Sequence, residues 1–418
     1  MRTRLLFQLG LMMFLQYAVW GSWMPILSGT LNSRGIAPDQ IGNVYAAMWA
    51  TCAISPFLGG QIVDRFMPSQ IFVGISHLLA AGAAFIMSTQ TEAGGLIMWM
   101  AIWGLLFSPT LAITNAIAFF HIDKIETEES LRERTFARIR TMGTIGWIVA
   151  AFVLAAFTQI INADPKGIVG PITEMRLTAL LGVVMGIFSF LLPNTPPSKA
   201  PQKDALAIRK AFSLFKTVPG FGVFMFISFF AATEFQFFYG LSAQFLGSKE
   251  IPHSLIPIFK TISQVAEIGA LAILLPMWLP SKGMRWCLLL GSFAWPLRYL
   301  IFAIGDPVWL VVLSLGLHGF GYAFVLVVQQ LYVDRVATKD IRASAQSLLT
   351  FVTLGVGNVL GSIFAGKVQA YFTHQVDGKS ITNWAPVFIL PTVTTVICAL
   401  AYMATFKNPV SSEEPETA

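Results

Sequence analysis

Leu192-Pro-Asn-Thr-Pro-Pro-Ser-Lys-Ala-Pro-Gln-Lys203 is the stretch that organises this chain. Proline and polar residues fill it, whereas long apolar runs lie on both sides of it. Proline interrupts helices because it lacks a backbone donor, so the stretch is expected to be a linker. There are six apolar runs of about 20 residues before the linker and six after it, and each is long enough to cross a bilayer. The predicted spans are 5–29, 40–63, 69–88, 94–120, 138–161, 173–193, 218–246, 254–279, 285–304, 307–332, 344–370 and 385–406.

The composition excludes an ordinary soluble domain. The 418 residues are 55 % hydrophobic and only 11 % charged, with a mean hydropathy of +0.69, whereas soluble domains are about 25 % charged. We predict an all-α membrane protein with twelve transmembrane helices in two six-helix bundles. The expected parts are a first bundle at 1–193, a cytoplasmic linker at 194–217, a second bundle at 218–406 and a cytoplasmic tail at 407–418.

The distribution of basic residues predicts the orientation. With the N-terminus inside, the inner loops and termini carry most of the lysines and arginines, and the outer loops carry only Arg34, Lys166, Arg176, Lys249 and Lys379. Cytoplasmic loops are enriched in basic residues. We therefore expect a multi-pass protein of a bacterial inner membrane with both termini in the cytoplasm.

Other functional classes lack their motifs in this sequence. It contains no nucleotide-binding P-loop, no zinc-protease or hydrolase motif and no potassium-channel filter. Cys52, Cys287 and Cys398 lie in apolar runs without metal-ligand spacing. The net charge of +6 is spread over loops. We expect no enzyme activity, no cofactor, no metal and no nucleic-acid partner, and a monomer surrounded by lipid.

A carboxylate stands inside one of the most apolar runs. Glu267 lies within Lys260-Thr-Ile-Ser-Gln-Val-Ala-Glu-Ile-Gly-Ala-Leu-Ala-Ile-Leu-Leu, where a charge costs about 2.5–3.5 kcal/mol on insertion scales. Lys260 and Gln264 are seven and three residues earlier, hence on the same helical face. That face is predicted to line a path through the membrane.

The fifth predicted helix carries a second polar face. Arg140, Thr144 and Trp147 stand at i, i+4 and i+7 and share one side of the helix. An arginine can grip hydroxyls or a carboxylate, and an indole can stack on a sugar or a base. The alternative is that Arg140 extends to the cytoplasmic interface and binds nothing.

The seventh predicted helix adds an amide and a ring. Gln236 and Tyr239 share a face, and a glutamine can both donate to and accept from a base or a sugar hydroxyl. The alternative is that Gln236 joins helices to one another. Glu234 points to another side, where it either pairs between helices or titrates.

Two more polar residues follow on the ninth and tenth predicted helices. Arg298 lies on the ninth, and His318 and Tyr322 share a stripe on the tenth. An isolated charge in the bilayer is costly, so we expect Glu267 to pair with Arg298 or to lie near His318. A carboxylate beside a cation can carry protons; the alternative is a permanent structural ion pair.

The six-plus-six arrangement resembles the major facilitator superfamily, and Gly60-Gln-Ile-Val-Asp64-Arg65 is similar to that superfamily's Gly-x-x-x-Asp-Arg loop. More specific stretches resemble its nucleoside:proton symporters. These are Phe14-Leu-Gln-Tyr-Ala-Val-Trp-Gly-Ser-Trp23, Arg140-x-x-Gly-Thr-Ile-Gly146, Ser263-Gln-x-x-Glu267, Leu297-Arg298, Gly305-Asp-Pro307 and Ile341-Arg-Ala-Ser-Ala-Gln346.

The resemblance implies site residues. It assigns substrate binding to Arg140, Thr144, Gln264 and Glu267, and Gln236 also matches a family position. Tyr239 replaces an amide, and Trp147 replaces a phenylalanine. The chain departs from the family on the tenth helix, where Ala323, or Val325 in a shifted register, fills the place of an aspartate tied to transport.

A second resemblance points to another substrate. Lactose-permease-like sugar symporters place an arginine and a tryptophan on helix 5, a glutamate on helix 8, an arginine on helix 9 and a histidine on helix 10. Arg140, Trp147, Glu267, Arg298 and His318 stand in similar places. The second helix 10 carboxylate of those permeases is missing.

These observations lead to one hypothesis, a secondary active transporter that imports nucleosides with protons by alternating access. Hydrogen bonds to ribose and base would come from Arg140, Thr144, Gln236, Gln264 and Glu267, with Trp147 and Tyr239 stacking and Tyr322 lining the site. Glu267 would be the main proton-linked group, tuned by Arg298 and His318. The alternatives are a proton-coupled sugar symporter and a multidrug exporter.

Overall fold

The computed structural model describes the whole chain except residues 1, 162–163, 165–167, 198–211, 339–340 and 407–418. The described residues are almost entirely helical, and their Cα atoms cluster into two compact units. The first unit contains residues 1–201 and 239–261, and the second contains residues 202–238 and 262–418. Most of the predicted linker, and the predicted tail, lie outside the described residues.

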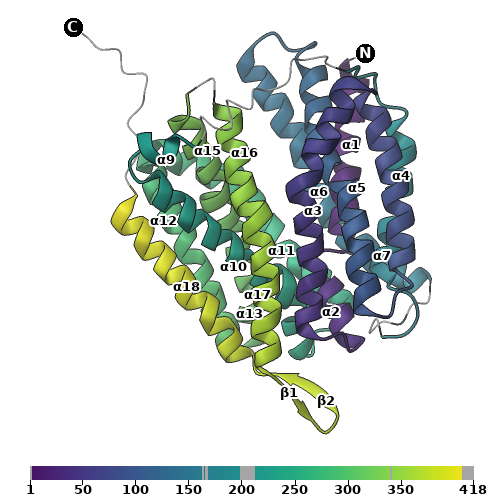
Figure 1. Cartoon of the computed structure of the whole chain (residues 1–418), viewed down its shortest axis with the longest axis vertical. Helices are drawn as coiled ribbons and strands as arrows, with labels where there is room; N and C mark the ends of the chain where they lie inside the picture. Colours follow the sequence, from purple (N-terminus) through teal and green to yellow (C-terminus); the bar gives the residue numbers. More distant parts are fainter. Residues whose placement is uncertain (1, 162–163, 165–167, 198–211, 339–340, 407–418) are drawn as a thin grey trace. The chain divides into compact units, whose positions relative to one another are not determined.

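The first unit contains six longer helices and one short one before the linker, together with residues 239–261. Helix α1 packs on α6, α3 packs on α5, and α4 packs on both α5 and α7, as Figure 1 shows for these purple and blue segments. Their bounds are α1 (Arg2–Gly21), α2 (Leu27–Ser33), α3 (Pro38–Arg65), α4 (Ser69–Met87), α5 (Ala93–Ile122), α6 (Glu129–Ile160) and α7 (Thr173–Ser189).

The first predicted span, 5–29, is wrong as one continuous helix. Helix α1 ends at Gly21, and a turn over residues 22–26 precedes the seven-residue helix α2. Pro25 lies in this turn, and a proline disfavours the helical conformation of the residue before it. The turn leaves backbone carbonyls free for other partners.

The second unit consists of helices that are repeatedly interrupted. Helix α12 packs on α18 and on α14, and α12 and α18 run side by side in Figure 1. The elements after α7 are α9 (Leu214–Thr217), α10 (Phe221–Ser248), η1 (His253–Leu255), α11 (Ile256–Gly269), η2 (Ala270–Leu274), α12 (Leu275–Ile304), α13 (Val308–Ser314), α14 (Gly316–Gly321), η3 (Tyr322–Val327), α15 (Val328–Val336), α16 (Arg342–Thr350), η4 (Phe351–Gly357), α17 (Asn358–Tyr371) and α18 (Trp384–Thr405). Of these elements, η1 belongs to the first unit, and α10 and α11 each contribute residues to both units.

Three of these interruptions are π-helical turns, namely η2, η3 and η4. A π-turn adds one residue to a helical turn and is frequent at functional sites. Two of them adjoin predicted site residues, because η2 begins three residues after Glu267 and η3 begins at Tyr322. Regular periodicity in the sequence predicted none of them.

The eighth and ninth predicted spans are joined more directly than expected. A helical stretch from His253 to Ile304 is continuous apart from Gly283, whose φ of 80° lies in the left-handed region. Glycine adopts this conformation without steric cost. The break therefore falls inside the interval that was predicted to be a loop.

A small β-hairpin is the feature that sequence reasoning missed entirely. Strand β1 (Thr373–Val376) pairs in antiparallel fashion with β2 (Lys379–Thr382) between α17 and α18. The connecting residues Asp377 and Gly378 both have positive φ, as a two-residue hairpin turn requires. The Asp-Gly pair was the signal that could have predicted it.

Long apolar helices dominate the described part of the chain. Nine of them, with the His253–Ile304 stretch counted as one, are long and apolar enough to cross a membrane. Helix α1 is not among the nine, and α7 has only 17 residues. This supports a multi-pass membrane protein, while the number of twelve spans stays a prediction.

Candidate functional site

The predicted helix 5 residues lie beside aromatic rings of α1. The guanidinium carbon of Arg140 is 4.1 Å from the centre of the Tyr17 ring, which is cation–π geometry. Two turns along α6, the Trp147 ring meets the Trp20 ring edge-on, with centroids 5.6 Å apart. These four residues and Thr144 are all half-buried. One face of α6 therefore keeps a cation, a hydroxyl and an indole accessible together.

Tyr17 is a candidate site residue that sequence reasoning missed. Its position three residues before Trp20 puts both rings on one face of α1, and that spacing was the available signal. Trp23, which follows three residues after Trp20, is fully buried and packs against Trp103 with ring centroids 5.3 Å apart. The accessible aromatic face of α1 therefore ends at Trp20.

A buried hydrogen-bond chain links three helices of the first unit. The Gln16 amide nitrogen donates to Thr110 Oγ1 at 2.8 Å, and Gln16 Oε1 lies 2.9 Å from His77 Nε2. All three side chains are 0 % exposed. Gln16 and Thr110 therefore join α1, α4 and α5 to one another and do not line an open path.

Two contacts bind the beginning of α11 and the residues before it to the rest of the first unit. Lys260 Nζ donates to the backbone carbonyl of Pro25 at 3.0 Å, and His253 Nε2 lies 3.1 Å from Thr30 Oγ1, within hydrogen-bond distance. Lys260 is 3 % exposed. The prediction that Lys260 lines the path with Gln264 is wrong in this structure, because its ammonium group is directed to the α1–α2 turn.

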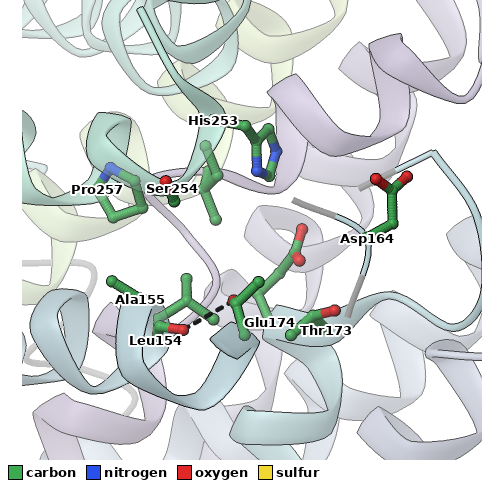
Figure 2. A pocket seen from close by; sticks show the side chains of 10 residues that line it. Leu154, Ala155, Asp164, Thr173, Glu174, His253, Ser254 and Pro257 are labelled. Carbon is green, nitrogen blue, oxygen red and sulfur yellow. Dashed lines mark hydrogen bonds between the residues drawn. The ribbon is translucent and has the colours of Figure 1, made fainter. Parts of the chain in front are cut away.

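A small cavity lies next to these contacts. It is lined by Ile26, Leu154, Ala155, Thr158, Asp164, Thr173, Glu174, His253, Ser254 and Pro257. Figure 2 shows the Glu174 carboxylate pointing into the space bounded by His253 and Asp164. Glu174 is 2 % exposed, and its Oε1 atom has no hydrogen-bond partner among the described residues.

The carboxylates of this cavity interact electrostatically with Arg34, which follows α2. Burial lowers the pKa of the Arg34 guanidinium, and the carboxylates of Glu174 and Asp164 oppose that shift. Glu174 also lies in the first turn of α7, where the helix dipole favours a negative charge. Among the described residues, no group of His, Cys, Asp and Glu side chains could hold a metal ion.

In the second unit, Gln236 is buried and contacts another helix. Its side chain is 1 % exposed, and its Oε1 atom lies 3.0 Å from the hydroxyl of Ser362 on α17. This contact favours the alternative that Gln236 joins helices. Tyr239, one turn further along α10, is half-buried and belongs by its contacts to the first unit.

Gln264 and Glu267 occupy successive turns of α11. Gln264 is 7 % exposed, and its Oε1 atom has no hydrogen-bond partner among the described residues. Glu267 is half-buried. An amide oxygen without a partner is a costly feature in a protein interior, and a substrate hydroxyl or amino group would satisfy it.

Helix α14 approaches α11 closely at Gly319. A side chain at this position would collide with the carbonyl of Ser263 and the backbone nitrogen of Glu267. The Ser263 hydroxyl also donates to the carbonyl of Leu315 at 3.0 Å. Only glycine allows this approach, which puts the backbone turn of Glu267 beside the turn that carries His318.

Arg298 and His318 are brought together, and both are 1 % exposed. Arg298 Nη1 lies 2.9 Å from His318 Nδ1. Since a guanidinium can only donate, Nδ1 accepts and the imidazole is neutral with its proton on Nε2. The guanidinium carbon also lies 4.6 Å from the Phe238 ring and 4.3 Å from the Tyr299 ring, and Phe238 stacks on the imidazole at 3.9 Å.

Two further positions on the tenth predicted helix are now placed. Tyr322 begins the π-turn η3 and is half-buried, with its ring centroid 6.2 Å from that of Phe235. Ala323 and Val325 are fully buried. The place where the resemblance implies an aspartate is therefore buried and apolar in this chain.

Comparison with known proteins identifies relatives over nearly the whole chain. A family model described as Nucleoside H+ symporter matches residues 1–411. YegT of Escherichia coli (strain K12) is 30 % identical over 412 residues, which cover 96 % of this chain and 93 % of the relative. The nucleoside permease NupG of the same organism is 27 % identical over 421 residues, which cover 96 % and 95 %.

Solved structures agree with these sequence matches. A crystal structure of a point mutant of the nucleoside transporter NupG matches with a TM-score of 0.85 at 27 % identity, covering 96 % of this chain and 100 % of the other. A bacterial homologue of the human lysosomal transporter Spinster matches with a TM-score of 0.71 at 14 % identity and covers 96 % of each chain. At that identity the second match supports the fold alone.

The apolar helices and the matched structures define a multi-pass membrane transporter of the major facilitator class, and not an enzyme. Within that class, the chain belongs to the nucleoside:proton symporter family. The family resemblance predicted from the motifs of α1, α6 and α11 is confirmed.

Proposed function

We propose that this protein imports nucleosides together with protons by alternating access. The observation that carries the proposal is the family match over residues 1–411, supported by the likeness to a nucleoside permease over almost the full length of both chains. Its setting would be a bacterial inner membrane, with a monomer of twelve spans in two bundles and both termini in the cytoplasm. The bundles would be residues 1–193 and 218–406, joined by a cytoplasmic linker at 194–217 and followed by a tail at 407–418.

The proposed substrate contacts follow from chemistry that the described residues offer. Arg140 and Thr144 present donors, and Trp147 and Tyr239 present rings on which a base can stack. In the second unit, Gln264 and Glu267 present acceptors, and Tyr322 presents a phenol. Gln236 would contribute only if its contact with Ser362 is exchanged for one with the substrate.

Proton coupling is proposed to depend on Glu267. This carboxyl is half-buried, so it can reach water, and the neighbouring turn of α14 carries His318 paired with Arg298. Binding of substrate and proton would favour one state of the transporter, and their release would favour the other.

Uptake of radiolabelled uridine tests the substrate class. In cells that lack their own nucleoside permeases, the protein should give saturable uridine accumulation that a protonophore abolishes. Lactose is the matched control, because it carries sugar hydroxyls without a base. Saturable uptake of lactose without uptake of uridine would overturn the nucleoside proposal.

The second candidate is proton-coupled sugar transport. The observation in its favour is the buried Arg298–His318 pair at 2.9 Å, because a helix 9 arginine and a helix 10 histidine resemble the arrangement of lactose-permease-like symporters. The same uptake experiment separates the two candidates. A multidrug exporter would instead be revealed by efflux of lipophilic cations.

A further inference from the structure

A second glutamate of the second unit is buried without a role in the scheme above. Glu234 lies in the interior of α10 and is 2 % exposed. Its Oε2 atom has no hydrogen-bond partner among the described residues. The backbone of this residue is bonded instead, since the Tyr299 hydroxyl donates to the Glu234 carbonyl oxygen. A structural glutamate in such a place would be expected to have its carboxylate oxygens bonded.

The charged group that acts on the Glu234 carboxyl is Arg298 of α12. Among the described residues, the Tyr299 phenol of α12 and the Cys398 thiol of α18 are also close enough to Glu234 to interact with it electrostatically. Arg298 in turn donates to His318 of α14. The neighbourhood of Glu234 thus contains one cation, one neutral imidazole and two weak acids.

The direction of the Arg298 hydrogen bond fits a neutral Glu234. A buried carboxylate is costly unless it is paired, and a guanidinium donates more strongly to a carboxylate than to an imidazole. Here Arg298 Nη1 donates to the His318 ring, while Glu234 Oε2 remains without a donor. This arrangement is the one expected when Glu234 holds a proton.

Loss of that proton would change the partner of Arg298. An anionic Glu234 would attract the guanidinium, whose contacts include the bond to His318 and the faces of the Phe238 and Tyr299 rings. Such a shift would weaken the bond to His318 and alter the turn of α14 that packs on the Glu267 turn through Gly319. A change in the protonation of Glu234 on α10 would thereby affect the Glu267 turn of α11.

We propose that Glu234 is a second proton-exchanging carboxyl of this transporter, and that Arg298 alternates between His318 and the Glu234 carboxylate as the proton leaves and returns. The proton on Glu234 would come from water on one side of the membrane and pass to water on the other side during the transport cycle. This inference rests on the proposed function only where transport is measured; the protonation of Glu234 is argued from geometry.

The test compares wild-type protein with Glu234→Gln in proteoliposomes that have an acidic exterior. Glutamine keeps the shape of a protonated glutamate and cannot release a proton. Each coupled proton multiplies accumulation by about tenfold per pH unit of gradient. Gradient-driven uridine accumulation by the variant should therefore be about tenfold lower than that of the wild type for each pH unit of gradient. Its exchange of external for internal uridine should stay within about twofold of the wild-type rate.

Infrared difference spectroscopy during a pH titration provides the readout that is independent of substrate. Wild-type protein should show a carboxylic-acid stretching band that is absent in Glu234→Gln and shifted in Glu234→Asp. Glu174→Gln is the matched control, since it removes an equally buried glutamate of the first unit, and it should retain both the band and the accumulation.

The outcomes separate the two proposals. Wild-type protein that fails to transport uridine but shows the Glu234 band would contradict the nucleoside assignment and support this inference. Gradient-driven accumulation at the wild-type level in Glu234→Gln, or a titration spectrum unchanged by that substitution, would overturn it. If Glu234→Gln does not fold, the Glu234→Asp spectrum decides, because an unshifted band then assigns the signal to another carboxyl.

Discussion

Glu174 in the first unit and Glu234 in the second are equally buried, with 2 % of each residue exposed and one carboxylate oxygen of each lacking a hydrogen-bond partner among the described residues. Their surroundings differ. Glu174 stands in the first turn of α7, beside a small cavity and in the field of Arg34. Glu234 stands in the middle of α10 with Arg298 as its cation.

The difference shows that burial alone does not decide what a carboxyl does. A helix N-terminus, space for water and a nearby cation all stabilise an anion, and Glu174 has all three beside it. Glu234 depends on one guanidinium that already donates to another group. A site whose charge depends on a movable partner is suited to change its charge during a cycle.

The largest effect is expected from Arg298→Leu. Removing the guanidinium leaves the buried His318 Nδ1 without its donor, and a buried polar group left unsatisfied costs about 1–3 kcal/mol of stability, so we expect a marked fall in Tm of the purified protein and no measurable uptake. Arg34→Leu is the matched substitution in the first unit. Arg34 is half-buried, and partly exposed ion pairs contribute up to about 1 kcal/mol, so its Tm should fall much less. An equal fall in Tm for both variants would contradict the proposed difference between the surroundings of Glu174 and Glu234.

Glu267→Gln should have the next largest effect. It keeps the size and hydrogen-bonding reach of the side chain but cannot exchange a proton, so accumulation driven by a pH gradient should be abolished. Exchange of labelled for unlabelled uridine should persist. Measuring both in the same vesicles distinguishes loss of coupling from loss of binding, and wild-type accumulation would contradict the proton role of Glu267.

A smaller effect is expected from Gln264→Leu. Its Oε1 atom has no partner among the described residues, and a hydrogen bond to a neutral group contributes about 0.5–1.5 kcal/mol. Uridine binding, measured by calorimetry, should therefore weaken by about two- to tenfold with proton coupling intact. Gln375→Leu, on the exposed strand β1, is the control and should leave affinity unchanged.

The smallest effect is expected from Lys260→Met, which removes the bond to the Pro25 carbonyl. Methionine is close to lysine in length, so packing is largely kept and the loss should be about 1 kcal/mol. Deuterium uptake in the turn at residues 22–26 should rise, as read by mass spectrometry. Lys249→Met is the control, and the same increase in that variant would show that the Lys260 bond does not hold the turn.

The sequence predicted those parts of the fold that depend on the length of an apolar run. Apolar runs located α3, α4, α5 and α18 to within a few residues, because a membrane helix must be apolar over its whole length. The π-turns and the break at Gly283 were not predictable in this way. They depend on tertiary packing, which produces no periodic pattern of apolar residues in the sequence.

The candidate site was predictable where a polar residue interrupts an apolar face. Arg140, Gln264 and Glu267 stood out for this reason, and each has an accessible or unsatisfied group in the structure. Lys260 stood out equally, but its partner is a carbonyl released by Pro25, a distant turn that no helical stripe could predict. Tyr17 was missed because an aromatic residue does not differ clearly in polarity from the apolar run around it.

The close approach at Gly319 has a consequence for protein engineering. Since no side chain fits between this residue and the backbone of Ser263 and Glu267, α11 and α14 fit each other as a matched pair. A chimera that takes α11 from one family member and α14 from another would disturb this fit. Exchange of specificity between relatives should therefore succeed when both helices are transplanted together and fail when either is moved alone.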